Sequence, residues 1–259
     1  MDTGTKRSLA VRTLEDAVVV ITGASRGIGR GIAEEFGRGG ARVVVNYHQS
    51  KAAAEEVVES LLKNGAKAAI AIQADVSDPE QAAGLIEETI KQFVRIDLLV
   101  NNAGINVDRS LRHMTVEDWR SVIERDLSSQ FYTTKAAINH FVEQSSGAII
   151  NMGSVAGLVG NFGQANYAAA KAGILGLTKT AALELARYNV TVNAVCAGPV
   201  DTPMWEAVPP DVKASILKRI PLNRVATVHE VARAVRYLYE DGEYYTGEAL
   251  NMTGGWIMA

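Results

Sequence analysis

The sequence has a single cysteine, Cys196, so no disulfide can form within the chain. Its four histidines, at positions 48, 113, 140 and 229, show no metal-ligand spacing with cysteines or acids, which argues against a metal enzyme. No apolar run is long enough to span a bilayer, and the first sixteen residues lack the apolar segment of a signal peptide. We therefore expect no metal, no membrane segment and a cytosolic location.

An excess of charge of either sign is also missing. Lysine and arginine total 26, aspartate and glutamate total 29, and the formal net charge is −3. This balance gives no electrostatic reason to bind nucleic acid, so a small-molecule ligand is expected. The 259 residues, 47% of them hydrophobic, suffice for one large domain. We expect a flexible tail over residues 1–14 and one domain over residues 15–259.

Short β-branched runs alternate with longer helical patterns along the chain. Runs such as "AVVVIT", "ARVVVNY" and "IDLLVNN" predict strands, and helices are expected to begin near residues 26, 51 and 79. Because these strands are apolar throughout, the sheet should be covered on both faces and therefore parallel. The sequence thus predicts the α/β class, with a doubly wound, Rossmann-like sheet in a single domain. Ligands of such sheets bind at the carboxyl ends of the strands.

The segment "TGASRGIG" follows the first expected strand and leads into a helix. Glycines at such a turn let the backbone approach a pyrophosphate, and a helix N-terminus offers free N–H groups. The spacing is G-x-x-x-G-x-G rather than G-x-G-x-x-G, and a glycine-rich turn without a ligand is the alternative. Its place inside a strand-helix-strand unit favours a dinucleotide site. The cofactor-binding residues expected in this turn are Gly23, Ser25, Arg26, Gly27, Ile28 and Gly29.

The end of the second expected strand, "NYHQSK", carries no acid that could accept a hydrogen bond from a ribose 2′-hydroxyl. Arg26 and Lys51 could instead meet a 2′-phosphate, with His48 and Ser50 as hydrogen-bonding neighbours. Alternatively, the two cations are solvated surface charges, which for Lys51 alone is the better guess. The pattern favours NADP(H) over NAD(H).

Two later strand ends should complete this cofactor site. The segment "ADVSD" places Asp75 and Val76 where the edge and face of an adenine could be received. The segment "NNAG" places Asn101 and Asn102 at the same edge of the sheet.

Tyr167 and Lys171 are one helical turn apart in "NYAAAK". A free phenol has a pKa of about 10, so a tyrosine needs a neighbouring ammonium to act as an acid or base near neutrality. By itself the spacing also fits a surface tyrosine beside a solvated lysine. Ser154, however, ends a predicted strand at the same sheet edge, where its hydroxyl could bind a substrate carbonyl.

In order, the motifs "TGASRGIG", "NNAG", "GSVAG", "GQANYAAAKAG" and "NMTGGW" resemble those of short-chain dehydrogenases/reductases, most closely the 3-oxoacyl-(acyl-carrier-protein) reductases. The resemblance runs from about residue 15 to the end. It implies that Tyr167 donates the proton in ketone reduction, that Lys171 binds the nicotinamide ribose and favours ionisation of the tyrosine, and that Ser154 orients the carbonyl. It also implies that Val200 and Thr202 lie near the nicotinamide.

An oligomer is expected as well, because members of this family are commonly tetramers. The apolar end "GGWIMA" has no charged side chain, and exposing Trp256, Ile257 and Met258 together would be costly. We therefore expect a homotetramer in which this end packs near a neighbouring subunit.

Asp126 is the main departure from the family. In the helix expected around "SVIERDLSSQFYTT" it falls on an apolar face, where burial of a carboxylate costs roughly several kcal/mol unless it is paired. The other residues of that face are Trp119, Val122, Ile123, Leu127 and Phe131. The family has its fourth catalytic residue, an asparagine, at this position. We therefore expect Asp126 to border the active site; a compensated core acid without a catalytic role is the alternative.

A second departure lies after the sixth strand, where the family has proline and this chain has Ala197, with Pro199 displaced beyond Gly198. The following residues 198–225 are proline-punctuated and are expected to form a substrate lid. Met204 and Trp205 in this lid would suit an acyl chain.

A 3-oxoacyl thioester is the expected substrate. Its carrier could be an acyl carrier protein, docked by basic residues of the lid, or coenzyme A, and the sequence does not separate the two. These basic residues, which could equally form a solvated helix face, are Lys213, Lys218, Arg219 and Arg224. A sugar, polyol or other ketone dehydrogenase of the same fold is one alternative, and a catalytically weak NADPH-binding regulator is another.

Overall fold

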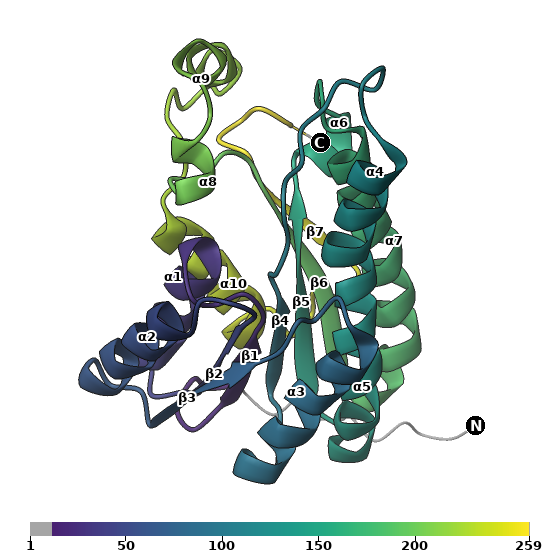
Figure 1. Cartoon of the computed structure of the whole chain (residues 1–259). Helices are drawn as coiled ribbons and strands as arrows, with labels where there is room; N and C mark the ends of the chain where they lie inside the picture. Colours follow the sequence, from purple (N-terminus) through teal and green to yellow (C-terminus); the bar gives the residue numbers. More distant parts are fainter. Residues whose placement is uncertain (1–11, 259) are drawn as a thin grey trace.

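One seven-stranded sheet organises the chain (Figure 1). The computed structural model describes residues 12–258. All neighbouring strands are parallel, in the order β3-β2-β1-β4-β5-β6-β7. The strands are β1 (Val18–Ile21), β2 (Arg42–Tyr47), β3 (Ala68–Gln73), β4 (Leu98–Asn101), β5 (Gly147–Ser154), β6 (Val190–Ala197) and β7 (Ala249–Met252). The strand order reverses between β1 and β4, and a ligand crevice is expected at the carboxyl ends there.

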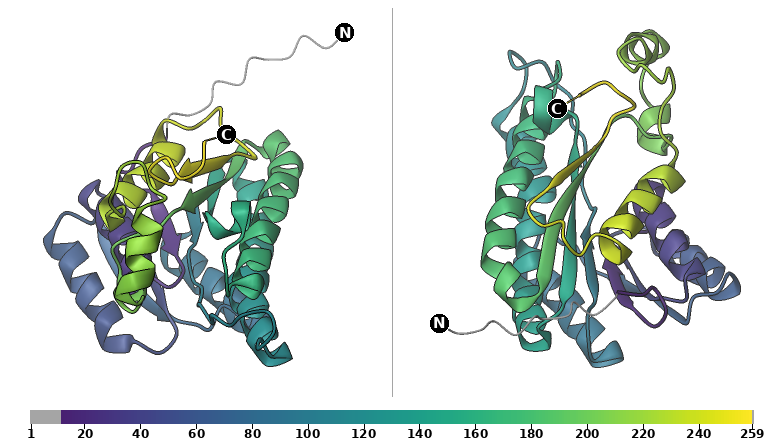
Figure 2. Two further views of the ribbon diagram at one scale, coloured as in Figure 1. Left: turned by 90° about the horizontal axis from the view of Figure 1, so that it is seen from above. Right: turned by 180° about the vertical axis from the view of Figure 1, so that it is seen from behind.

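Helices cover both faces of this sheet, which confirms the predicted α/β doubly wound class (Figures 1 and 2). One face carries α1 (Gly27–Arg38), α2 (Lys51–Lys63) and α10 (Val228–Glu240). The other carries α3 (Pro79–Phe93), α5 (Ser129–Gln144) and α7 (Ala165–Leu185), followed by the 3₁₀ turn η2 (Ala186–Tyr188). Shorter helices lie beyond the carboxyl ends of the strands: α4 (Val116–Val122), α6 (Ala156–Val159), α8 (Pro203–Glu206) and α9 (Pro210–Leu217). Within residues 12–258, no helix has the length and apolar character needed to cross a membrane.

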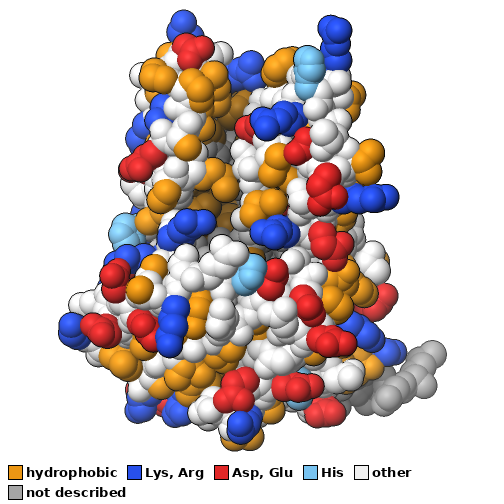
Figure 3. Space-filling model, viewed as in Figure 1, with side chains coloured by type: hydrophobic (Ala, Val, Ile, Leu, Met, Phe, Trp, Pro, Cys, Tyr) orange, Lys and Arg blue, Asp and Glu red, His pale blue; other side chains and the backbone are white. Residues whose placement is uncertain are grey.

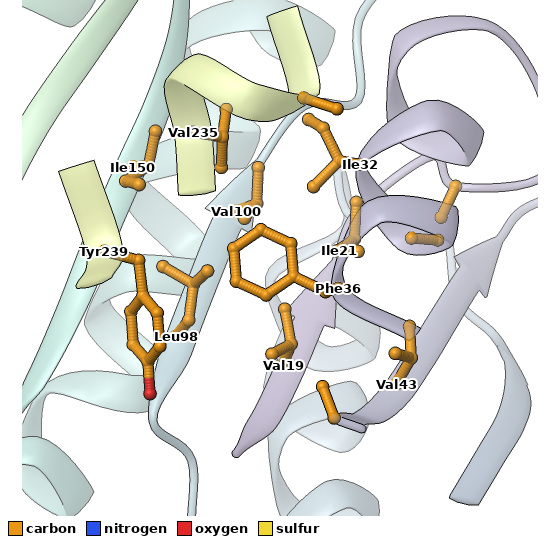
Figure 4. Packing of buried hydrophobic residues seen from close by; sticks show 14 of the residues in the cluster. Val19, Ile21, Ile32, Phe36, Val43, Leu98, Val100, Ile150, Val235 and Tyr239 are labelled. Carbon is orange, nitrogen blue, oxygen red and sulfur yellow. The ribbon is translucent and has the colours of Figure 1, made fainter. Parts of the chain in front are cut away.

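The strands are apolar on both faces because a separate core lies on each side of the sheet. In β1, Val19 and Ile21 face one core and Val20 faces the other. In the first core, the rings of Phe36 on α1 and Tyr239 on α10 pack with centroids 5.8 Å apart (Figure 4). Burying one large apolar side chain of this kind contributes about 1.5–3 kcal/mol, so the sheet and its helices hold each other in place.

The long helix expected around Asp126 is divided into three segments. Between α4 and α5 lies the π-helical segment η1 (Ile123–Ser128), which contains Asp126. The predicted apolar face is wrong at Trp119 and Phe131, which are 40% and 48% exposed. Asp126 is fully buried, in agreement with the core-facing position expected for it. The prediction assumed one unbroken α-helix with 3.6 residues per turn, and the wider π turn rotates the side chains that follow it, including Phe131, away from that spacing. Trp119 precedes η1, so this reason does not apply to it.

The first residues that the structure describes already belong to the folded domain. Arg12 donates from Nη1 to Thr191 Oγ1 at 2.8 Å and from Nη2 to Gly147 O at 2.6 Å. Leu14 is buried against Gly39, where a Cβ would lie 2.2 Å from its Cδ1. Of the tail predicted over residues 1–14, residues 12–14 are therefore fixed, and residues 1–11 lie outside the described part of the chain.

Candidate active site

The turn between β1 and α1 is shaped for the close approach of a ligand. Gly23 and Gly27 have φ angles of +62° and +57°, in the left-handed region that glycine enters without strain. At Gly29 a Cβ would lie 2.6 Å from both Asn102 Nδ2 and Gly23 O, so a larger residue does not fit. The N-cap residue Arg26 makes no side-chain cap, which leaves the first N–H groups of α1 available to an anion. These features fit a pyrophosphate.

Two asparagines hold this turn in place. Asn46 in β2 accepts from Gly23 N at 3.1 Å through Oδ1 and donates to Ala74 O at 3.1 Å through Nδ2. Asn102 donates to Thr22 O at 2.8 Å. Asn102 was expected at this edge, whereas Asn46 was not, because in the sequence it is only a polar residue inside an apolar strand.

The strand ends expected to receive adenosine lie next to each other. His48 directly follows β2, and its Nδ1 lies 3.6 Å from Oδ2 of Asp75, which lies just beyond β3. Ser77 donates to the other oxygen of Asp75 from Oγ at 2.6 Å and from N at 3.0 Å. Burial raises the pKa of Asp75, but the hydrogen bonds from Ser77 and the charge of His48 outweigh it and hold this pKa below its usual value. Val76 is buried beside Asp75.

Arg26 and Lys51, the two cations expected near a 2′-phosphate, differ in their surroundings. Lys51 lies on the exposed surface of α2, with Nζ 3.7 Å from Glu55 Oε1. Arg26 lies exposed in the glycine turn over residues 23–29, which we call the cradle. It makes no ion pair within residues 12–258. Arg26 is therefore the better placed of the two to meet an anion.

Strand β5 and helix α7 carry the three residues expected to move a proton. Ser154 ends β5, and Tyr167 and Lys171 lie one turn apart on α7. Lys171 Nζ is 5.4 Å from the centre of the Tyr167 ring and donates to Met152 O at 3.0 Å. Because Met152 is two residues before Ser154, the lysine reaches the carboxyl end of β5. The ammonium of Lys171 thus lies beside both the Tyr167 ring and the end of β5.

Asn166, which was not among the predicted site residues, fixes the start of α7. This fully buried side chain donates to Val107 O at 3.1 Å and to Asp118 O at 3.0 Å. Its Oδ1 accepts from Tyr167 N at 2.8 Å. Asn166 thus ties the tyrosine to the loop after β4 and to α4. In the sequence it appears only as an ordinary polar residue in the first turn of a helix.

Asp126 in η1 faces Lys171. Its Oδ2 lies 3.2 Å from Lys171 Nζ, although the two groups are not aligned for a hydrogen bond. Its Oδ1 accepts from Ile105 N at 2.7 Å. Oδ2 also packs on Gly104, where a Cβ would lie 2.6 Å from it. Asp126 therefore joins η1 to the loop after β4 and to α7.

Burial acts on both members of this pair. It raises the pKa of Asp126, and this effect outweighs the charge of Lys171 and the hydrogen bond from Ile105, both of which lower it. Burial also opposes the charge of Lys171, but the charges of Asp126 and Tyr167 outweigh it and hold the pKa of Lys171 above its usual value. The pair thus keeps the lysine protonated.

The second departure from the family is Ala197, which stands in place of a proline at the end of β6. The backbone at this position stays beside β7. Ala197 O accepts from Val155 N at 2.9 Å, and Gly198 N donates to Met252 O at 2.9 Å. The backbone is therefore held at Ala197 without the proline that the family has there.

The segment predicted to form a lid begins beside the glycine turn. Val200 forms an isolated β-bridge with Ala226, and Thr202 caps α8 by accepting from Trp205 N at 3.3 Å. A Cβ at Gly27 would lie 3.7 Å from Thr202 Cγ2, which places Thr202 next to the glycine turn. Val200 and Thr202 are thus held near the site expected for the cofactor.

A hollow opens above the carboxyl ends of the strands, between α8 and α9 on one side and α4 on the other (Figure 3). Exposed apolar side chains occur on the segments around it, and these are Leu111, Phe162 and Met204. Within residues 12–258, no three histidine, cysteine, aspartate or glutamate side chains are grouped as metal ligands.

Comparison with known proteins decides the family. A family model described as short chain dehydrogenase matches residues 17–213. The chain belongs to the short-chain dehydrogenase family. This confirms the resemblance found in the sequence, and as a short-chain dehydrogenase the protein is an oxidoreductase with a nicotinamide cofactor, which the cradle fits.

Three proteins similar to this short-chain dehydrogenase carry the name 3-oxoacyl-(acyl-carrier-protein) reductase. The 3-oxoacyl-(acyl-carrier-protein) reductase of Synechocystis sp. is 48% identical over 243 residues, which are 93% of this chain and 97% of the relative. The 3-oxoacyl-(acyl-carrier-protein) reductase FabG of Staphylococcus aureus is 44% identical over 240 residues, or 92% and 97%. FabG of Escherichia coli is 41% identical over 245 residues, or 94% and 98%.

Proposed function

We propose that the protein reduces the ketone of a 3-oxoacyl thioester to a secondary alcohol, with NADPH as the reductant. The observation that carries this proposal is the pairing of Tyr167 with Lys171 at the end of β5, on the sheet edge that also holds the glycine turn. The 41% to 48% identity to 3-oxoacyl-(acyl-carrier-protein) reductases supports the choice of substrate.

The cofactor is assigned to the edge formed by the ends of β1, β2, β3 and β4. When bound, it supplies the hydride. The preference for NADPH rests on two features. Arg26 could bind the 2′-phosphate, and the residue that follows β2 is His48 rather than an acid that would bind a ribose 2′-hydroxyl. The residues proposed to hold the cofactor are Gly23, Ser25, Arg26, Gly27, Ile28, Gly29, His48, Asp75, Val76, Asn102, Tyr167, Lys171, Val200 and Thr202.

Four side chains are proposed to handle the carbonyl oxygen and its proton. The Ser154 hydroxyl donates to the carbonyl oxygen and orients it, and the Tyr167 hydroxyl gives its proton to that oxygen as the alcohol forms. The Lys171 ammonium stabilises the phenolate that remains, and Asp126 keeps Lys171 charged and in place. General-acid catalysis of this kind contributes about 10²–10⁴ in rate.

An acyl carrier protein as the carrier of the substrate is the finer part of the proposal. Of the four basic lid residues considered for docking, Arg224 is already bound to Glu230, with contacts of 2.8 and 2.6 Å, and lowers the pKa of Glu230 to about 2. Lys213 donates to Glu206 O at 3.0 Å, and Arg219 lies over the Trp256 ring. Lys218 is the one of the four basic residues without a contact named above. A single basic residue does not favour an acidic acyl carrier protein over coenzyme A, so both carriers stay in the proposal.

A homotetramer in the cytosol completes the proposal. Several large apolar or aromatic side chains are exposed on a single chain, and these include Trp119, Phe131, Leu183, Tyr244 and Met258. Exposed apolar area of this kind is typical of surfaces that meet another subunit.

The test is NADPH oxidation with acetoacetyl thioesters of coenzyme A and of acyl carrier protein, a simple ketone and a sugar, with Tyr167→Phe as the control. Turnover of a thioester that is lost in the variant is the expected result. Turnover of the ketone or the sugar alone would move the substrate to another class. Tight NADPH binding without any turnover would instead indicate a regulator.

A further inference from the structure

Three buried polar atoms on one helical turn have no hydrogen-bond partner in the protein. Among the side chains of residues 12–258 they are Asp126 Oδ2 and both amide atoms of Gln130. Asp126 is 0% exposed and Gln130 is 2% exposed, so bulk solvent does not reach them. Asp126 Oδ2 still faces the Lys171 ammonium at 3.2 Å, whereas the two amide atoms of Gln130 have no polar partner in the protein. An unpaired buried polar group costs about 1–3 kcal/mol, so the Gln130 amide requires a physical reason.

The two residues are four positions apart, where η1 passes into α5. Helical residues at this spacing share a face, and their side chains lean back over the preceding turn. This spacing and lean put the Gln130 side chain over the turn that carries Asp126, and no direct hydrogen bond joins the two side chains. Water can bridge two polar groups that do not touch each other.

The neighbouring polar residues do not take up the Gln130 amide. Asn101 donates to Thr134 Oγ1 at 3.1 Å and to Asn151 Oδ1 at 2.9 Å, and its own oxygen accepts from Thr133 Oγ1 at 2.6 Å. This network is complete without the Gln130 side chain. The Gln130 amide is thus left without a partner in this network.

We propose that Asp126 and Gln130 enclose an internal hydration site, in which a water molecule donates to Asp126 Oδ2 and bonds to the Gln130 amide. Buried waters typically make about three hydrogen bonds to groups that would otherwise be unpaired. A donor to Asp126 favours its carboxylate form, and the carboxylate in turn holds the Lys171 ammonium 3.2 Å away.

Gln130 is thereby a positioning residue, which acts on Lys171 through water and Asp126. The other ionisable groups that face the pair are Tyr167 on α7 and Cys196 on β6, and burial raises the pKa of Cys196 so that it stays a neutral thiol. This step rests on the proposed function, whereas the hydration site itself does not.

The first test is a high-resolution crystal structure of the unmodified protein. We expect an ordered water within hydrogen-bonding distance of Asp126 Oδ2 and of the Gln130 amide. A map that shows waters elsewhere in the core and none between these two side chains would overturn the proposal.

The second test uses Gln130→Met, which keeps the length of the side chain and removes both amide atoms. Loss of the hydrated amide leaves Asp126 with fewer donors, so its pKa rises and the acidic limb of the pH–rate profile moves up by about half a pH unit or more. The melting temperature should fall. A dry, unpaired amide predicts the opposite, a higher melting temperature with an unmoved acidic limb, and that result would refute the hydration site.

Phe141→Leu is the matched control, because Phe141 is fully buried on the same helix and far along it from Asp126. It should lower the melting temperature and leave the acidic limb in place. If Gln130→Met does not fold, the crystal structure of the unmodified protein decides alone. If no substrate is turned over, the proposed function fails, while the water and the melting temperatures still decide the hydration site.

Discussion

Asp126 and Lys171 form an ion pair that is almost fully shielded from solvent, with Oδ2 3.2 Å from Nζ and side-chain exposures of 0% and 5%. Loss of one partner from a buried pair leaves an uncompensated charge, which typically costs about 3–5 kcal/mol. The sequence left two alternatives for Asp126, a compensated core acid and an acid that borders the active site. The structure shows the compensating group, which is the lysine beside Tyr167, and a catalytic role for Asp126 stays a prediction.

Asp126→Asn should move the basic limb of the pH–rate profile to lower pH. The carboxylate favours the protonated form of Lys171 and opposes a second negative charge on Tyr167. Its removal lowers the pKa of Lys171 and makes the phenolate easier to form, so alcohol oxidation near neutrality should become faster. Profiles of the two proteins that superimpose would mean that this aspartate is electrostatically silent.

Tyr167→Phe should lower turnover by about a hundredfold or more and leave NADPH binding nearly intact, because only the donated proton is lost. Tyr132→Phe is the matched control, since Tyr132 is a tyrosine on α5 whose hydroxyl donates to Glu124 on the exposed surface. Single-turnover rates and NADPH titrations measure the two effects separately. Normal turnover by Tyr167→Phe would assign the proton donor to another group.

Lys171→Ala should damage both catalysis and folding. The ribose and phenolate contacts proposed for the ammonium are lost, and Asp126 is left buried without a cation. We expect weaker NADPH binding, slower turnover and a free energy of unfolding lower by about 3–5 kcal/mol. An unchanged free energy of unfolding in a denaturant titration would show that the pair is not ionised.

Arg26→Ala should remove most of a preference for NADPH over NADH that we expect to be at least tenfold, or about 1.4 kcal/mol. Arg26 lies at the cradle without an acid partner in the described residues, and no acid follows β2 to hold a ribose 2′-hydroxyl. Lys51→Ala is the control, because Lys51 is already paired with Glu55 on the surface. Equal dissociation constants of the unmodified protein for the two cofactors would contradict the assignment.

Val94→Gly should stabilise the fold by about 0.5–1 kcal/mol. Val94 ends α3 with a φ of +67° and is 83% exposed, so this β-branched residue occupies a left-handed conformation with little packing in return. Val116→Gly is the control, since Val116 is also exposed but lies in the first turn of α4, where glycine should lower stability. Denaturant titrations measure both, and a loss of stability in Val94→Gly would be the contrary result.

The sequence predicted those parts of the molecule that depend on local patterns. The β-branched run of β1, the glycine turn and the one-turn spacing of Tyr167 and Lys171 each specify their geometry within a few residues. The position of Asp126 at the active site came from resemblance to a family, and the distance to Lys171 agrees with it. The role of each site residue stays a prediction.

What the sequence did not predict depends on contacts between distant segments. Asn46 and Asn166 look like ordinary polar residues until the fold brings Gly23 and Val107 to them. The π-helical segment η1 has no distinctive composition, and it changes which side of the helix Phe131 occupies. Spacing rules assume a regular helix and could not show this change.

The all-parallel sheet also has a consequence for how the chain reaches its native state. No two neighbouring strands are joined by a hairpin, so every pairing must wait for a helix-containing crossover. The bond from Val18 N to Asp97 Oδ2 spans 79 residues, and the central β1–β4 pair requires closure of a loop of similar length. Such non-local contacts slow folding, and the apolar strands remain open to association with other chains until they pair. The protein should therefore refold best when it is dilute.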